Sequence, residues 1–198
     1  MILPRSFYER HDVVLIAREL LGKFICTQER GIITAGMICE TEAYEGITDR
    51  ASHAYGGRRT GRTEIMYASG GTAYIYLCYG IHSLFNVVTN RKEIPHAVLI
   101  RGIVPSKGLE TMLNRTGKKK VFKEMGIGPG KVARLLGIHY SQTGADLTKG
   151  ERDKAGFKIW IEDRGLKTEP GMIETGPRIG VQYAGPDALL PNRFQLRQ

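Results

Sequence analysis

Cysteine is scarce in this sequence, with Cys26, Cys39 and Cys78 as the only three among 198 residues. They stand far apart and form no paired zinc motif, so we expect them to be reduced residues of the core. Long hydrophobic runs are lacking, since none approaches the roughly 20 residues that cross a bilayer. The N-terminus also lacks the basic-then-apolar order of a signal peptide. We therefore expect a cytoplasmic protein without a disulfide framework or a membrane partner.

Acidic residues are in short supply, with 20 Asp and Glu against 29 Lys and Arg, which gives a net charge of +9. A surplus of this size on a compact protein indicates a polyanionic partner. Ribosomal, RNA-binding and DNA-binding proteins share this surplus, so charge alone does not choose among them. Hydrophobic residues make up 41% of the chain, and we find no repeat or linker. Residues 1–198 are therefore expected to form a single domain with a sizeable core.

The stretch from Ile33 to Tyr44 alternates with the two-residue period of a β-strand. In a regular strand Glu40 and Glu42 project from one face, and the chain then leaves through a turn that contains Gly46. A carboxylate at the end of a strand, just before such a turn, is well placed to act on a bound ligand. The alternative is an ordinary solvated strand face, because charged side chains are mostly exposed.

Residues 45–70 form a long polar connection that holds His53 and the basic cluster Arg58, Arg59 and Arg62. Loops of this length without structure of their own are uncommon in compact domains and are usually functional. A ligand-binding loop and an exposed, solvated loop are both compatible with these residues.

A β-hairpin is expected over residues 72–89, where two alternating segments flank Gly80. Tyr79 and His82 bracket the turn, so a large aromatic ring lies at or near a protruding tip. Tyrosine on a strand usually packs against the sheet. A tip tyrosine is different, because its exposed ring has a solvation cost unless a partner covers it.

Two polar residues interrupt the apolar segments that follow. Asn86 stands in the returning strand of the hairpin, where it could satisfy a neighbouring backbone group. Arg101 is the one charged residue in the apolar strand expected over 97–104. A buried arginine needs a partner, and Glu42 is one option.

The Gly-rich turn from Gly126 to Lys131 precedes a helix expected over 132–136. It is not a nucleotide P-loop, because the glycine spacing is too short and Val132 replaces Ser or Thr. Backbone N–H groups at such a turn can still bind an anion such as a DNA phosphate. Further helices are expected over 12–22 and from Pro105 to Leu113, and further strands over 23–29, 157–162, 178–183 and 193–196.

Several segments share the residues and the order of one known family: Glu40–Tyr44, His53–Arg58, Tyr74–Gly80, Asn86, Leu99–Arg101, Gly128–Lys131 and Arg178–Gly185. They resemble the alkyladenine (3-methyladenine) DNA glycosylase family, a mammalian-type family with bacterial members. The resemblance implies an α+β fold, a single mixed domain with a curved antiparallel β-sheet flanked by helices and a protruding β-hairpin, similar to the C-terminal domain of formyltransferases. It also implies that no metal or organic cofactor is needed.

The activity that this resemblance implies is a step of base-excision repair. An alkylated or deaminated purine is flipped out of duplex DNA and its N-glycosidic bond is hydrolysed, which leaves an abasic site. By position, Glu42 would align and deprotonate the attacking water, and Arg101 would position Glu42 or the water. Glu40 is expected to support the strand. No lysine stands at a position that the resemblance marks, so Schiff-base lyase chemistry is not expected.

The resemblance also implies how the substrate is held. Tyr44, His53 and Tyr76 would enclose the flipped base, and Asn86 would lie against the minor-groove edge of the purine. Tyr79 would wedge into the minor groove and fill the vacated space. The expected partner is double-stranded DNA containing damaged purines. The protein is expected to act as a monomer and, if it is bacterial, to associate with the nucleoid. The other residues expected to contact DNA are His82, Arg58, Arg59 and Lys131.

Two other functions remain open at this stage. A basic domain without activity could read RNA through Tyr74, Tyr76 and Tyr79. Phosphate transfer at Gly126–Lys131 is weaker, because the nucleotide motif fails. Glu42 distinguishes a glycosylase from a binding domain without activity. A domain that only binds an anionic nucleic acid needs no carboxylate in its binding pocket.

We expect binding to duplex DNA to weaken steeply as the salt concentration rises, because phosphate contacts release condensed counterions. The slope of log Kd against log salt, measured from low to physiological ionic strength, checks this. Affinity that stays flat over that range would mean that the +9 charge is unrelated to DNA.

Overall fold

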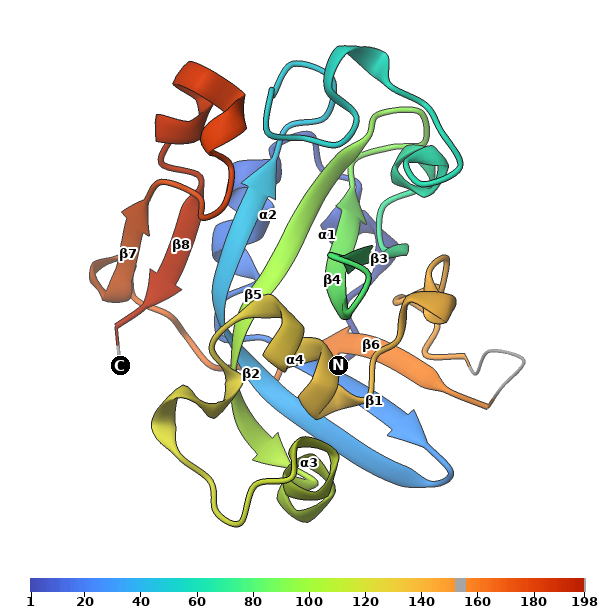
Figure 1. Ribbon diagram of the computed structural model, residues 1–198, viewed down its shortest axis with the longest axis vertical. Helices are drawn as coiled ribbons and strands as arrows, with labels where there is room; N and C mark the ends of the chain where they lie inside the picture. Colours follow the sequence, from blue (N-terminus) through green and yellow to red (C-terminus); the bar gives the residue numbers. More distant parts are fainter. Residues whose placement is uncertain (152–155, 198) are drawn as a thin grey trace.

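The computed structural model describes residues 1–151 and 156–197, and its centre is an eight-stranded sheet (Figure 1). The strand order is β3-β4-β5-β2-β1-β6, with β8 beside β2 and β7 beside β8, and every pairing is antiparallel. The α+β fold class expected from the sequence is confirmed. The strands are β1 (Phe24–Glu29), β2 (Ile32–Tyr44), β3 (Ala73–Cys78), β4 (His82–Thr89), β5 (His96–Lys107), β6 (Lys158–Glu162), β7 (Ile173–Gly176) and β8 (Arg193–Leu196).

Strand β2 organises the sheet. Residues 32–37 of β2 pair with β1, whereas residues 40–42 pair with β8. Strand β5 pairs with residues 35–44 along the opposite edge. Because β2 exchanges one neighbour for another halfway along its length, its C-terminal half lies between β5 and the β7–β8 pair (Figure 1).

Helices cover the sheet from both sides. In Figure 1, α2 lies behind β2 and α4 lies in front of β5, and both contact the sheet. Their buried apolar residues form one core with the strands, which includes Ile16, Leu20, Phe85, Ile100 and Leu136. Within the described part of the chain, no helix has the length and apolar character that crossing a membrane requires. The helices are α1 (Arg5–Tyr8), α2 (Val13–Glu19), α3 (Leu109–Thr116) and α4 (Pro129–Leu136), and the short 3-10 segments are η1 (Tyr55–Gly57), η2 (Glu64–Tyr67), η3 (Lys123–Gly126), η4 (Tyr140–Gln142), η5 (Pro170–Met172) and η6 (Gln182–Leu189).

Local signals in the sequence predict several of these elements well. Asp12 caps α2 by accepting a hydrogen bond of 2.8 Å from the Leu15 N–H. The turn between β1 and β2 has Arg30 and Gly31 at positive φ, as a two-residue hairpin turn requires. The expected hairpin over 72–89 is present as β3 and β4.

The start of one predicted helix and one predicted strand are wrong. No helix begins at Pro105, because β5 continues to Lys107 and the Ser106 hydroxyl donates to the Ala35 carbonyl; α3 begins only after Gly108, which has positive φ. Residues 178–183 are not a strand. The Arg178 side chain turns inward to a buried ion pair with Asp49, and the chain then enters η6. Strand β7 was not expected, and α4 begins three residues early, at Pro129, where proline suits a first helical position.

The cysteines form no disulfide among the described residues. Cys26 and Cys39 are buried as expected, but Cys78 is only half-buried, because it lies close to the hairpin tip.

Candidate active site

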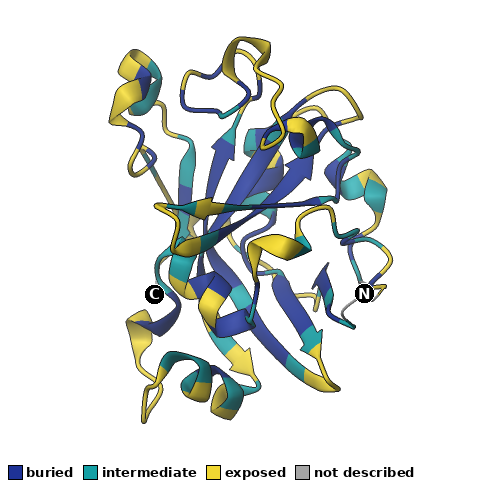
Figure 2. Cartoon of the chain, turned by 45° about the vertical axis from the view of Figure 1, so that its right-hand side comes forward, coloured by how far each residue is buried: buried dark blue, intermediate teal, exposed yellow. Residues whose placement is uncertain are grey.

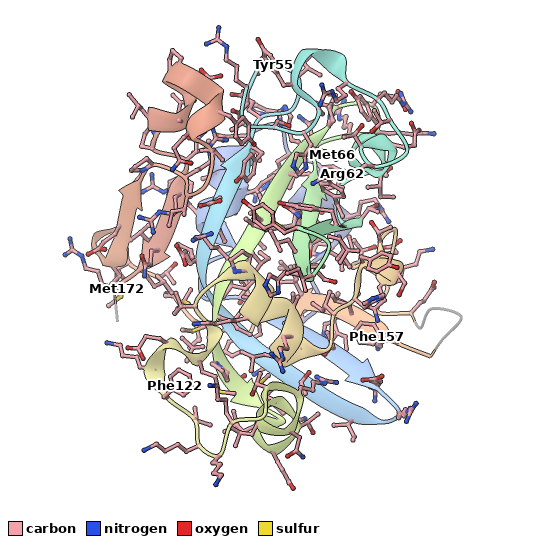
Figure 3. The ribbon with its side chains drawn as sticks, in the orientation of Figure 1. Tyr55, Arg62, Met66, Phe122, Phe157 and Met172 are labelled. Carbon is pink, nitrogen blue, oxygen red and sulfur yellow. The ribbon has the colours of Figure 1, made fainter. Side chains whose placement is uncertain are left out.

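A cavity of about 470 Å³ lies between the C-terminal half of β2, the β3–β4 hairpin, residues 51–66 and residues 179–183. The structure brings together every residue that the sequence assigned to catalysis or to base binding. Figure 3 labels Arg62 and Met66, which reach the cavity from the connection between β2 and β3. The polar and aromatic residues that line it include Glu42, Tyr44, Ser52, His53, Arg62, Tyr74, Tyr76, Tyr79, Asn86, Arg101 and Tyr183.

Glu42 is fully buried and lines this cavity. One of its oxygens, Oε1, accepts a hydrogen bond of 2.9 Å from the Ile179 N–H, and Oε2 accepts one of 2.8 Å from the Tyr44 hydroxyl. Each carboxylate oxygen can accept more than one hydrogen bond, so a water molecule in the cavity could still bind Glu42. Glu40 is buried as well, so the alternative of a solvated strand face is wrong.

Burial raises the pKa of the Glu42 carboxyl above its usual range. The Ile179 N–H, the Arg101 guanidinium and the Tyr44 hydroxyl each oppose this shift. The same desolvation raises the pKa of Tyr44 well above 10, so its hydroxyl remains a donor to the carboxylate. The cavity thus holds a carboxylate of increased basicity with neutral donors on both oxygens.

Arg101 contacts both glutamates of β2. Its Nε donates to Glu40 Oε1 at 3.1 Å and lies 3.6 Å from Glu42 Oε1. The sequence correctly indicated that this arginine needs a carboxylate partner. The hydrogen-bonded partner is Glu40, and Glu42 is the longer contact of the two.

Aromatic side chains form one wall of the cavity. The rings of His53 and Tyr76 meet edge to face at 4.8 Å, and the Arg62 guanidinium lies 4.5 Å from the centre of the Tyr76 ring. Arg62 is also 3.2 Å from His53 Nε2. Because a guanidinium only donates, Nε2 is the acceptor, and His53 Nδ1 donates to the Tyr74 hydroxyl at 2.8 Å.

His53 is therefore not the exposed loop histidine that one interpretation of the sequence allowed. Burial, together with the positive charges of Arg62 and Arg58, lowers the pKa of His53 to about 4. The imidazole is consequently neutral at physiological pH.

Asn86 lies at the cavity with its side chain fixed by the backbone. Its NH₂ group donates to the carbonyls of Tyr74 at 3.2 Å and Leu84 at 3.3 Å. The structural role that the sequence allowed for Asn86 is thus present, and the residue lines the cavity at the same time.

The hairpin tip projects beyond the sheet. Figure 2 shows its strands changing from buried at the sheet to exposed at the turn. Tyr79 is 92% exposed and has a positive φ, and Ile81 beside it is 73% exposed. A large apolar tip without a covering residue is typical of a surface that contacts a partner.

The residues predicted to contact DNA fall into two groups. His82 and Lys131 line a second hollow between the hairpin tip and the start of α4. Arg58 and Arg59 are exposed on the connection between β2 and β3 and do not line the cavity. The Arg59 guanidinium forms ion pairs with Glu64 and Glu93.

Sequence reasoning missed several residues that build the site. Arg178 is buried, donates to the Ala43 carbonyl at 2.9 Å, and pairs with Asp49. This contact fixes the segment from which Ile179 bonds Glu42, and Tyr183 also lines the cavity from that region. The motif 178–185 belonged to the family resemblance, but nothing local indicates that Arg178 meets a residue 129 positions away.

Within residues 1–151 and 156–197, no group of three or more His, Cys, Asp or Glu side chains is arranged to hold a metal ion. The chemistry that the site can perform with its own groups is proton acceptance by a buried carboxylate beside aromatic walls.

Comparison with known proteins places this arrangement in context. Over residues 6–198 the sequence matches the family described as Methylpurine-DNA glycosylase (MPG). A protein of Chlamydia felis named "Putative 3-methyladenine DNA glycosylase" is 44% identical over 196 residues, which cover 98% of this chain and 96% of that protein. Proteins of the same name from Clostridium perfringens and Bacillus cytotoxicus are each 40% identical, and the matches cover 93% and 98% of this chain and 90% and 95% of theirs.

We expect Asp49→Asn to lower the free energy of unfolding by about 3–5 kcal/mol, because it leaves the buried Arg178 guanidinium without its counter-charge. Urea unfolding measures the loss. Glu93→Gln is the control, since it removes a carboxylate from an exposed arginine pair and should have a much smaller effect. Equal losses in the two variants would contradict a stabilising role for the buried pair.

Proposed function

The chain belongs to the methylpurine-DNA glycosylase family, and we propose that it releases alkylated purines such as 3-methyladenine by means of a water molecule that Glu42 activates. The family that the sequence motifs resembled is thereby confirmed, and the chain is an N-glycosylase of DNA repair that acts on alkylated purines. The observation that best supports the mechanism is the fully buried Glu42 carboxylate in an aromatic cavity, with the exposed Tyr79 at its edge.

Base flipping is the first step of this mechanism. A base inside a duplex cannot be attacked at its sugar carbon, and turning it out has a cost of a few kcal/mol. The Tyr79 ring would enter the minor groove and replace part of the lost stacking, as apolar wedges at this position do. The net charge of +9 would attract the duplex, and His82 and Lys131 lie near the tip to meet the backbone.

The cavity suits a purine that carries a positive charge. Methylation at N3 or N7 makes the base cationic, and a cation over an aromatic face gains roughly 0.5–2 kcal/mol. Tyr44, His53 and Tyr76 would supply these faces. The same charge makes the base a good leaving group, so hydrolysis needs a general base and no general acid.

Glu42 would act as that base. A water molecule bound to the carboxylate would give up a proton as its oxygen attacks the sugar carbon, and the electrons of the glycosidic bond would leave with the base. The raised pKa of Glu42 increases its basicity, while Arg101 at 3.6 Å favours the ionised form. The rate should therefore fall as pH decreases through the pKa of Glu42.

Neutral lesions such as hypoxanthine must be protonated before they leave. His53 is a poor source of that proton, since its pKa of about 4 keeps it neutral at physiological pH. We therefore propose that cationic alkylated purines are the preferred substrates and that deaminated purines are released more slowly.

We expect Glu42→Gln to retain binding to damaged duplex and to lose excision by about 10²–10⁴-fold in single-turnover rate, because an amide cannot accept the proton. Base release from duplexes that contain 3-methyladenine, 7-methylguanine, hypoxanthine or ethenoadenine measures the rate. Glu64→Gln, which changes an exposed carboxylate on the connection, should behave as the parent. Excision by Glu42→Gln at the parent rate would refute the mechanism and favour a nucleic-acid-binding domain without activity.

Asn86→Ser should increase the release of guanine relative to adenine. The Asn86 amide is held rigidly by two backbone carbonyls, so the amino group of a bound guanine would meet it, whereas adenine has only hydrogen at that position. The ratio of the two release rates from methylated duplex is the measurement. An unchanged ratio would mean that Asn86 only supports the hairpin.

A further inference from the structure

Glu40 is a buried carboxylate that the mechanism above does not use. It is 2% exposed and does not line the cavity. It packs against Gly102 of β5, where a Cβ atom would lie only 3.0 Å from the Glu40 Cβ and 3.3 Å from Oε2. The absence of a side chain at position 102 therefore provides the space for this carboxylate.

Two arginines converge on Glu40. Its Oε1 accepts hydrogen bonds from Arg101 Nε at 3.1 Å and from Arg193 Nη1 at 2.9 Å. Because Arg101 Nε also lies 3.6 Å from Glu42 Oε1, the four side chains form one cluster with two positive and two negative charges. Arg101 is thus shared between two carboxylates and is hydrogen-bonded to the one outside the cavity.

An irregularity in the sheet places Arg101 between the two glutamates. In the pairing of β2 with β5, Glu40 lies opposite Gly102 and Thr41 lies opposite Ile100, so Arg101 is an extra residue of β5. Its carbonyl accepts a hydrogen bond of 2.9 Å from the Gly128 N–H, which lies outside the sheet. Bulges of this kind change the direction of a side chain and are frequent beside active sites.

We propose that Glu40 is a positioning residue: it holds the Arg101 guanidinium back from a close ion pair with Glu42, and Arg193 limits this hold because it shares Glu40 Oε1 with Arg101. The inference depends on the proposed function, since it concerns the base of that reaction. A guanidinium free of Glu40 would form a two-pronged pair with Glu42, occupy the lone pairs needed by water, and weaken the base. With Glu40 in place, Arg101 stabilises the charge on Glu42 without covering it.

Several charged or titratable groups act on Glu42. Burial has the largest effect and raises its pKa, and the Glu40 charge raises it further, whereas Arg101 lowers it. Arg193 stands opposite Glu42 in the β2–β8 pairing. Among the described residues, the charged or titratable groups around Glu42 are Glu40 and Tyr44 on β2, Arg101 on β5, Arg193 on β8, Tyr76 on β3, Arg178 with its partner Asp49, and Tyr183. His53 and Arg62 line the same cavity.

Glu40→Gln should shift the acidic limb of the single-turnover pH profile by roughly half a unit to lower pH, because a negative neighbour is lost and Arg101 moves closer to Glu42. The rate on the plateau should fall several-fold, since the base is weaker. Arg193→Gln should move the acidic limb to higher pH for two reasons. It removes a positive charge near Glu42, and it lets Glu40 bind Arg101 without competition, so that Arg101 stabilises the Glu42 charge less. The double variant Glu40→Gln/Arg193→Gln should return the limb close to its parent position.

Glu174→Gln is the matched control. Glu174 lies opposite Gln195 in the β7–β8 pairing and bonds Arg197 at 3.1 Å, so it is an arginine-paired glutamate of the same region outside the cluster. Its pH profile should equal that of the parent. Urea unfolding of each variant gives the folded fraction by which the rates are corrected.

Opposite shifts in the two single variants support the proposal. The proposal is overturned if both acidic limbs shift in the same direction. It is also overturned if the limbs and the rates, corrected for the folded fraction, equal those of the parent; Glu40 would then have a structural role only. If Glu40→Gln does not fold, the direction of the Arg193→Gln shift decides by itself.

Glu42→Gln separates this inference from the proposed function. Excision by that variant at the parent rate would refute both proposals, because no base would remain for Glu40 to tune. If Glu42→Gln is inactive but the acidic limbs of Glu40→Gln and Arg193→Gln stay at the parent position, only the role of Glu40 is refuted.

Discussion

The burial of the Glu42 carboxylate is the constraint on which the site depends. An ion removed from water is unstable unless donors and opposite charge surround it. Here the Ile179 N–H and the Tyr44 hydroxyl occupy one oxygen each, and Arg101 supplies the charge at 3.6 Å. The remaining desolvation leaves the pKa of Glu42 raised, which is the property that a base for water requires.

These donors come from distant parts of the chain, and the fold must hold them in place. The pair of Arg178 and Asp49 fastens the segment before η6 to the connection that follows β2. Arg178 also lies over the Tyr44 ring, with 4.8 Å between the guanidinium carbon and the ring centre. The contact that shapes one wall of the cavity therefore also orients a donor to Glu42.

Sequence patterns were most reliable where structure is local. Alternation predicted the β3–β4 hairpin, and the position of Tyr79 beside Gly80 predicted an exposed ring at its tip. The same reasoning failed at Pro105, because strand pairing with β2 outweighed the local tendency toward a helix start. It failed again at 178–183, because a buried ion pair of long range determined the path of that segment.

The sequence by itself determined the hairpin and the basic surplus, because periodicity and charge are written along the chain. The order of its motifs, through the family resemblance, also indicated the fold class and the residues proposed for catalysis and base binding, which line the cavity. Only the tertiary structure decided which groups stand against Glu42. Two carboxylates with the same alternation, Glu40 and Glu42, look equivalent in the sequence. They differ because a bulge in β5 turns Arg101 toward Glu40, and the segment at Ile179 closes over Glu42 alone.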